Sequence, residues 1–156
     1  MQINWNPEEH DAKISALKDK KIFLLNTPSK YKPAQYLEVL KLNQQIWELE
    51  MEKVSNNFLE KLENITYIDL HGKTIDEAEH ILFFLFEWMC SNSEIPESME
   101  IITGRGTLRL YNWLEKNLQL IINEYDLPLE TIIYNPDNFH FTIKFKKSFH
   151  RHLRNF

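Results

Sequence analysis

Two short polar segments contain the residues whose types and spacing suggest chemistry. The first, Asp69-Leu70-His71-Gly72, ends a run of apolar and β-branched residues that is typical of a strand. Because side chains alternate along a strand, Asp69 and His71 are expected on one face and Leu70 on the other. An imidazole exchanges protons near neutral pH, and ligands meet α/β sheets at the carboxyl ends of strands. The segment predicts a proton-transfer site; the structural alternative is a strand-end hydrogen bond that caps the following turn.

The second segment, Thr103-Gly104-Arg105-Gly106-Thr107, lies between a predicted strand and a predicted helix. Backbone N–H groups of such a loop can point at an anion, and the helix dipole adds to the attraction. The alternative is a tight strand-to-helix turn with Arg105 in solvent. A dinucleotide site is not expected, because the third glycine of that motif is absent and Arg109 stands in its place. If the two strands are neighbours, both segments lie at one edge of the sheet.

Glycine is scarce in this chain of 156 residues. There are only three glycines, where average usage near 7% would give about eleven. Gly72, Gly104 and Gly106 all follow predicted strands. Their placement indicates that they serve backbone geometry or the close approach of another group.

Charge is unevenly distributed along the chain. Residues 63–137 carry fourteen acidic and four basic side chains. An acidic body argues against indiscriminate nucleic-acid binding. Three of those four bases, Lys73, Arg105 and Arg109, lie in or beside the two polar segments. A locally positive field is therefore expected there.

The rest of the sequence predicts the elements that position these residues. Apolar periodicity and turn residues predict two helices followed by the order β-α-β-α-β-β. The expected helices span residues 7–25, 33–62, 74–90 and 107–125, and the expected strands span 65–70, 99–103, 130–134 and 139–145. Alternation of strands and helices implies an α/β (α+β) fold with a mixed, partly parallel sheet whose last strand is antiparallel.

The chain divides into a helical N-terminal extension (1–62), one domain (63–147) and a basic C-terminal tail (148–156). The helix expected over 33–62 is about 45 Å long at 1.5 Å per residue. A small domain does not need such a length, so its apolar stripe must pack on the domain or on a partner. The tail either binds nucleic acid by charge and stacking or frays as a terminus.

Several protein classes and site types are excluded. One cysteine, Cys90, allows neither an internal disulfide nor a cysteine-based zinc site. The first ten residues lack a secretory signal, and the longest apolar run, 81–86, has six residues, far fewer than a membrane helix needs. We expect a cytoplasmic or nuclear protein without a membrane partner. His140, His150 and His152 do not predict a metal site, because they are divided between a polar strand face and the tail.

Together, the two segments resemble the small MutS-related (Smr) domain. That family is marked by a Leu-Asp-x-His-Gly element, a helix that begins with a Glu-Ala pair, and a later Thr-Gly-x-Gly element. Here Ile68-Asp69-Leu70-His71-Gly72, Glu77-Ala78 and Thr103-Gly104-Arg105-Gly106 match in order and spacing. The similarity covers about residues 64–146.

The resemblance implies a two-layer sandwich similar to the C-terminal domain of bacterial translation initiation factor three. It also implies an endonuclease that cuts RNA or branched or double-stranded DNA. The chain departs from the family pattern where Thr107-Leu108-Arg109 follows the second element, and where Asp137-Asn138 replaces a common glycine.

We therefore hypothesise phosphodiester cleavage at this edge of the sheet. His71 would transfer protons, Asp69 would orient His71, act as a base or hold a metal, and Arg105 would stabilise the transition state. The candidates for binding phosphate are Lys73, Gly104, Gly106, Thr107 and Arg109, with Lys146, Lys147 and Arg151 near the C-terminus. RNA supplies its own 2′-hydroxyl nucleophile, whereas DNA needs an activated water and favours Mg²⁺ or Mn²⁺; no other cofactor is expected.

Two other functions stay open at this stage. One is a non-catalytic module of the same fold that binds nucleic acid or the ribosome. The other is a protein-interaction module that uses the helix over 33–62. The expected partners are RNA or DNA, with a ribosome or a repair or RNA-processing complex as the recruiting assembly. The sequence is compatible with a monomer and does not specify an oligomer.

Overall fold

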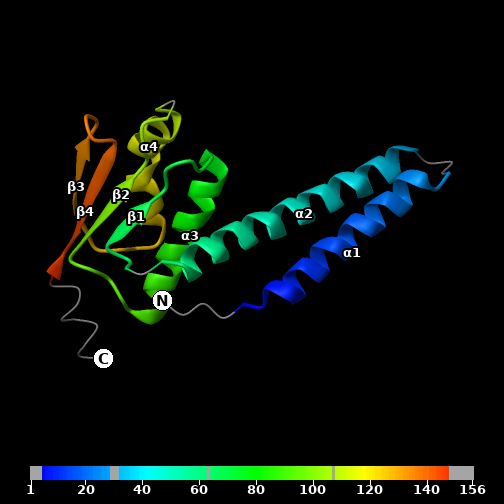
Figure 1. The fold of residues 1–156 in the computed structure, drawn as a ribbon, viewed down its shortest axis with the longest axis horizontal. Coiled ribbons are helices and arrows are strands. Elements are labelled where there is room, and N and C mark those ends of the chain that lie inside the picture. Colours follow the sequence, from blue (N-terminus) through cyan, green and yellow to red (C-terminus); the bar gives the residue numbers. More distant parts are fainter. Residues whose placement is uncertain (1–4, 29–31, 63, 107, 148–156) are drawn as a thin grey trace.

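The computed structural model of the chain describes residues 5–28, 32–62, 64–106 and 108–147. The elements follow the predicted order, with two helices before β-α-β-α-β-β (Figure 1). They are α1 (Pro7–Asn26), α2 (Lys32–Glu60), β1 (Tyr67–Asp69), α3 (Ile75–Asn92), β2 (Ser98–Ile102), α4 (Arg109–Glu124), β3 (Leu129–Asn135) and β4 (His140–Phe145). The predicted mixture of helices with a mixed sheet is confirmed.

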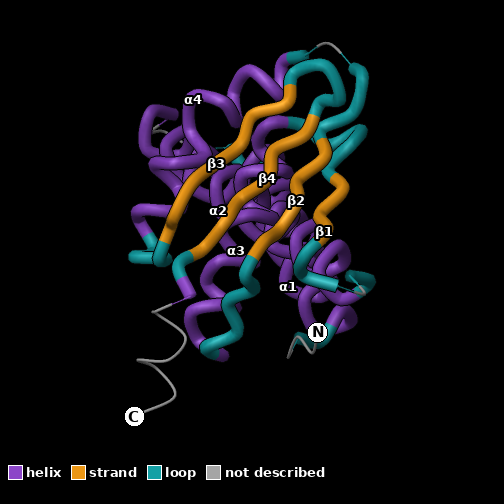
Figure 2. Tube along the Cα trace, turned by 90° about the vertical axis from the view of Figure 1, so that its left-hand side faces the viewer, coloured by secondary structure: helices purple, strands orange, loops and turns teal. Residues whose placement is uncertain are grey.

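The four strands form one sheet in the order β1-β2-β4-β3. β1 and β2 are parallel, and β4 is antiparallel to both of its neighbours, as predicted for the last strand. In Figure 2, α3 and α4 lie behind the sheet and cover one of its faces. Because β1 and β2 are parallel neighbours, the loops that follow them emerge at the same edge of the sheet.

The core lies between the covered face of the sheet and the two helices behind it. Alternate strand residues are buried there, including Ile68, Met99, Ile101, Phe141 and Ile143. The facing helix residues include Ile81, Leu82, Leu85 and Phe86 of α3 and Leu114 and Leu118 of α4. Removing apolar surface from water stabilises the folded state by about 25 cal/mol per Å², so this layer makes the main contribution to stability.

The start of α3 matches its sequence signal. Thr74 Oγ1 accepts a hydrogen bond from the Glu77 backbone N–H at 3.1 Å. In return, Glu77 Oε1 accepts one from the Thr74 backbone N–H at 2.9 Å. This reciprocal capping box satisfies two donors that a helix start otherwise leaves unpaired.

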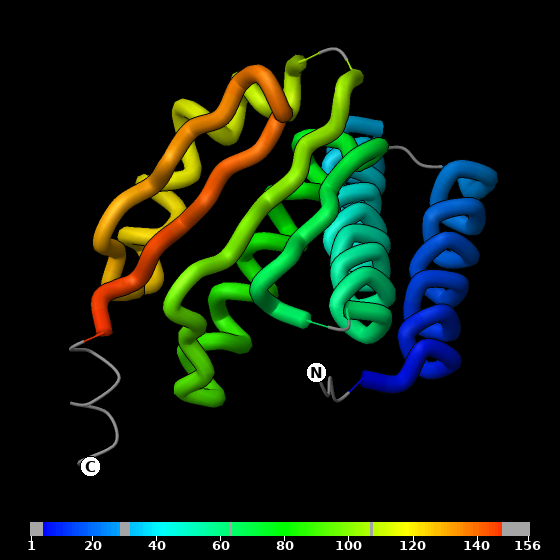
Figure 3. Tube along the Cα trace, turned by 60° about the vertical axis from the view of Figure 1, so that its left-hand side comes forward, coloured from blue at the N-terminus to red at the C-terminus, as the bar shows by residue number. Residues whose placement is uncertain are grey.

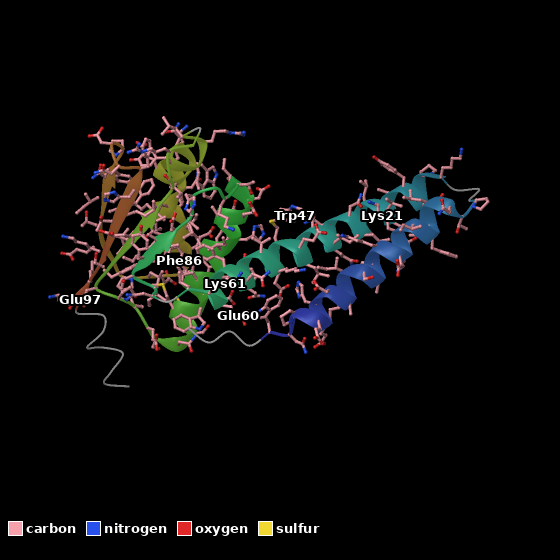
Figure 4. The ribbon with its side chains drawn as sticks, in the orientation of Figure 1. Lys21, Trp47, Glu60, Lys61, Phe86 and Glu97 are labelled. Atoms are coloured by element: carbon pink, nitrogen blue, oxygen red, sulfur yellow. The ribbon has the colours of Figure 1, made fainter. Side chains whose placement is uncertain are left out.

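The N-terminal extension is an antiparallel helical hairpin that projects from the body (Figures 1 and 3). The buried side chain of His10 on α1 fixes the pairing, because its Nε2 donates a hydrogen bond to the Leu49 carbonyl at 2.6 Å. The second half of α2 packs on the body, where the Trp47 ring meets the His80 ring edge-on at 5.1 Å. Figure 4 labels Trp47 on α2 and Phe86 within the core.

Candidate active site

The Asp69 and His71 side chains form a hydrogen-bonded pair at the end of β1. Leu70 between them is fully buried, whereas the Asp69 and His71 side chains are 39% and 72% exposed. Asp69 Oδ1 accepts a hydrogen bond from His71 Nδ1 at 2.7 Å and a second from the His71 backbone N–H at 3.0 Å. The predicted common face is confirmed, and the carboxylate also caps the turn.

This pairing fixes the tautomer of the imidazole. A carboxylate only accepts, so the proton between the two side chains lies on Nδ1 of His71. Nε2 has no hydrogen-bond partner within the described residues. It is therefore the nitrogen that can exchange a proton with a ligand.

Gly104 brings the second loop against His71. Its φ of +80° lies in the left-handed region, and a Cβ built at this position would lie 2.8 Å from the His71 Cβ. Any side chain here would push the two loops apart. Gly72 also has a positive φ, of +75°. Gly106 has no positive φ, and nothing lies within 4 Å of a Cβ built there, so neither backbone conformation nor close packing requires a glycine at this position. The prediction of close approach is confirmed for Gly104, whereas no other part of the described chain approaches Gly106.

The two loops enclose a hollow of about 640 Å³. Lys73, Arg105 and Arg109 line it together with His71, and Asp76 is the one acidic residue in the lining among the described residues. The Lys73 Nζ itself lies 5.8 Å from the centroid of the Phe58 ring, at the rim of this hollow. Three bases against one acid give this hollow a positive character within an otherwise acidic body.

The first turn of α4 adds unpaired backbone donors to this hollow. Leu108 precedes the helix in the left-handed conformation, with φ of 62° and ψ of 0°. Within the described residues no side chain caps this end, and its first turn contains no acidic residue. Leu108, Arg109, Leu110 and Tyr111 all line the hollow. The positive end of the helix dipole is therefore available to an anion.

Thr107, a predicted phosphate contact, lies outside the described residues.

Asp69 itself lies behind His71. It does not line the 640 Å³ hollow but a second one of about 670 Å³, between β1 and the end of α2. Phe58, Lys61 and Tyr67 line this second hollow, and Lys73 lines both. Of the three roles predicted for Asp69, orienting His71 fits this position best. Within the residues that the structure describes, no group of three or more His, Cys, Asp or Glu side chains could hold a metal ion.

Sequence reasoning missed Tyr111, which lines the hollow from α4. Its side chain is only 4% exposed and stacks on Phe141, with ring centroids 4.7 Å apart. Burial is the main cause that raises the pKa of its hydroxyl, and Glu115 adds to the shift. Its place in the first turn of the predicted helix was the available signal, because residues there lie close to the loop that precedes the helix.

The basic residues at the end of β4 do not join this site. Lys144 pairs in register with Ser98 at the start of β2, whereas the loops of the site follow the other end of that strand. A strand of five residues spans roughly 17 Å. Lys146 and Lys147 follow β4 at this far end, and Lys147 Nζ lies 3.6 Å from Glu97 Oε1. The structure thus separates them from the His71 site, and Arg151 with the rest of the tail lies outside the described residues.

No protein-family model, curated protein or solved structure matches this chain significantly. The resemblance to the Smr family therefore depends on the two motifs, their order and their spacing. None of the helices in the described part of the chain is long and apolar enough to cross a membrane.

Proposed function

We propose that the chain is an endonuclease of the Smr type that cleaves RNA, with a domain related to the C-terminal domain of translation initiation factor three. One observation carries the proposal. The close approach of Gly104 to His71, which a Cβ at 2.8 Å would prevent, brings an oriented imidazole against a loop suited to phosphate. Neither motif alone would place a proton-transfer group beside an anion site.

Cleavage of RNA needs one base at this site. Nε2 of His71 takes the proton from a ribose 2′-hydroxyl, and the freed oxygen attacks the adjacent phosphorus. The bond from phosphorus to the 5′-oxygen then breaks, and water protonates that leaving oxygen. The products are a 2′,3′-cyclic phosphate and a 5′-hydroxyl. The 2.7 Å hydrogen bond from Nδ1 to Asp69 stabilises the imidazolium that forms during the attack.

The cations and backbone donors stabilise the transition state. Negative charge increases on the non-bridging phosphate oxygens as the 2′-oxygen attacks. Arg105 and Arg109 present guanidinium groups, and the uncapped start of α4 presents backbone N–H groups. Lys73 lines both hollows. It can therefore contact a phosphate next to the scissile one, if the bound RNA strand passes from one hollow to the other.

A non-catalytic module that binds nucleic acid or a ribosome is the second candidate. The composition of the hollow favours it, because three cations and a helix end suited to phosphate line it, while His71 is the one imidazole among its described lining residues. Such a site retains affinity even where chemistry is slow. An activated water, with Mg²⁺ or Mn²⁺, is the route that a DNA substrate would require.

A cleavage assay separates these candidates. Labelled single-stranded RNA and branched DNA are incubated with the wild-type chain and with His71→Ala, each with and without a chelator. We expect RNA to be cut to cyclic-phosphate ends in the presence of chelator, and the substitution to slow cutting by about 10²–10⁴-fold. Cutting at the wild-type rate by His71→Ala would refute the mechanism. Binding without cutting would favour the second candidate, and chelator-sensitive cutting of DNA would favour the metal route.

A further inference from the structure

The outer end of the hairpin carries an exposed apolar surface that the proposed nuclease does not use. Among the described residues, eleven large hydrophobic side chains are exposed, and six of these belong to α1 and α2 near the turn between them. They are Ile22, Phe23, Leu25, Tyr36, Leu37 and Leu40. Solitary exposed apolar residues are normal on a surface, but a cluster at one end of a projecting hairpin indicates an interaction site.

Four of these residues share one side of the hairpin. On α2, Gln35 and Val39 face α1, since Gln35 Nε2 donates to the Leu24 carbonyl and Val39 is buried. Tyr36 and Leu40 each follow one of these inward residues by one position. On α1, Ile22 and Leu25 likewise follow the half-buried Lys21 and Leu24. In a pair of antiparallel helices, the residue that follows an inward-facing residue points to the same side of the pair on both helices, because each step along a helix turns the side chain by about 100°. We call Ile22, Leu25, Tyr36 and Leu40 the hairpin patch.

The hairpin patch continues a stripe that the body covers farther along α2. Trp47 lies seven residues after Leu40 and so on the same side of the helix. There the stripe is covered, because Trp47 packs on His80 of α3 at 5.1 Å. Beyond the body, Tyr36 and Leu40 remain 64% and 44% exposed. A helix lying in line with α3 would cover the rest of the stripe as α3 covers its end.

The charge around the hairpin patch is opposite to that of the body. The described residues between 18 and 41 include five lysines and two acidic residues, a net charge of +3. Residues 63–137 have a net charge of −10. Lys18 pairs with Glu50 at 3.0 Å. Among the described side chains, Lys20, Lys32 and Lys41 have no acidic partner within 4 Å. A ligand that is both apolar and acidic therefore complements this end of the hairpin.

These observations favour one occupant. Two copies meeting through their patches would bring together two clusters of lysines, which repel. The acidic body of a second copy could also lie on the hairpin patch, in a closed dimer or a ring, and self-association that depends on the hairpin patch would reveal that arrangement. We propose that the hairpin patch binds an acidic amphipathic helix of a partner protein, which lies across α1 and α2 in line with α3 and forms a three-helix bundle.

The test uses the full chain and two synthetic helical peptides with one leucine stripe at helical spacing. One peptide has glutamate at its polar positions, and the other has lysine. Titration by fluorescence anisotropy should give micromolar binding of the glutamate peptide and at least about tenfold weaker binding of the lysine peptide. The double variant Tyr36→Ser, Leu40→Ser should weaken binding of the glutamate peptide by at least about tenfold.

Leu120→Ser is the matched control, because Leu120 on α4 is equally apolar and 63% exposed but lies on the body. It should bind the glutamate peptide as the wild-type chain does. Circular dichroism of all variants establishes that the helices persist. Absence of binding at about 1 mM peptide, or equal binding of both peptides, would overturn the proposal. Self-association in ultracentrifugation that Tyr36→Ser, Leu40→Ser abolishes would also overturn it, as would capture by phosphatidylserine vesicles without peptide binding. Failure of the chain to cut RNA would leave the peptide-binding result unaffected.

Discussion

The N-termini of α3 and α4 lie at the same edge of the sheet, but only that of α3 is capped by side chains of the described residues. Both helices follow strands of the parallel pair β1 and β2. The start of α3 pairs its own donors through Thr74 and Glu77 and carries Asp76 and Glu77 in its first turn. The start of α4 has Leu108 in a left-handed conformation, no side-chain cap in the described residues and no acidic residue in its first turn.

This difference separates a helix start that is structural from one that is available to a ligand. A capping box uses side chains to satisfy orphan N–H groups, and acidic residues neutralise the helix dipole. Both devices stabilise the folded chain: the capping box occupies donors that a phosphate would need, and the carboxylates repel an anion. Their absence at α4, next to Arg105 and Arg109, leaves hydrogen-bonding capacity and positive potential for an anion. In the proposed site, the loop before α4 is therefore the half that would bind phosphate, and the loop before α3 holds His71.

The largest expected effect is that of Gly104→Ala. The new Cβ would lie 2.8 Å from the His71 Cβ, and the alanine would have to adopt a φ of +80°. The two loops must therefore separate. We expect a loss of about 1–3 kcal/mol in the free energy of unfolding and at least about a 100-fold loss of RNA cutting. Urea denaturation and single-turnover cleavage measure the two effects.

Gly106→Ala is the control for this substitution, because nothing lies within 4 Å of a Cβ at that position and its φ is not positive. Its stability should stay within about 0.5 kcal/mol of the wild-type value. Equal effects of the two substitutions on cutting and stability would show that contact with His71 is not what the glycine provides.

A smaller effect is expected when one cation is removed from the side of α4. Arg105→Ala and Arg109→Ala should each weaken RNA binding by about tenfold and reduce the slope of log K against log salt by about 0.7. Lys116→Ala removes an exposed base from the same helix, outside the hollow, and should change neither quantity. Filter binding over a range of salt concentrations would contradict the assignment if all three variants behaved alike.

Much of the fold was predictable because local patterns and tertiary packing agree. Strict alternation over residues 139–145 predicted β4, and the capping box predicted the start of α3. The predicted ends failed where tertiary context decides. β1 covers Tyr67–Asp69 rather than 65–70, because turns flank it: the Tyr67 N–H donates to the Asn64 carbonyl before the strand, and the Lys73 N–H donates to the Leu70 carbonyl after it. Similarly, α4 starts at Arg109 rather than 107, because Leu108 adopts a left-handed conformation.

The site was predictable as far as its residues belong to contiguous motifs. Asp69, His71, Gly104 and Arg105 lie together because parallel neighbouring strands end at one edge, which the strand–helix order implies. The second hollow could not be predicted. It lies where the end of α2 meets β1. A contact between two segments that a short loop joins leaves no periodic pattern of apolar residues in either segment.

A change in stability alone is expected at the capped end. Thr74→Ala removes the hydroxyl that accepts from Glu77 N–H and should lower the free energy of unfolding by about 1 kcal/mol. Leu108→Ala should change it by less than about 0.5 kcal/mol, because the Leu108 side chain caps nothing and is exposed. Thermal or urea unfolding of both variants measures the contrast. If both lost the same stability, the two helix starts would not differ as argued.

The smallest expected effect concerns the phenol that α4 buries at the back of the hollow. Burial raises the pKa of Tyr111 above its ordinary value of 10.0, so the folded state favours the neutral hydroxyl. This contribution is complete below about pH 10 and is lost as the pH rises above it, because the unfolded chain releases the proton first.

Tyr111→Phe removes this contribution. Its free energy of unfolding should therefore fall less steeply than that of the wild-type chain above pH 10, by at most about 1.4 kcal/mol per pH unit for one proton. Urea denaturation between pH 8 and pH 11 measures the slope. Burial also raises the pKa of Tyr125, so Tyr125→Phe should flatten the slope in the same sense and the double variant should be flatter than either. An alkaline slope that Tyr111→Phe leaves unchanged would mean that the hydroxyl at the start of α4 stays hydrated, and that the hollow is wetter than its packed wall implies.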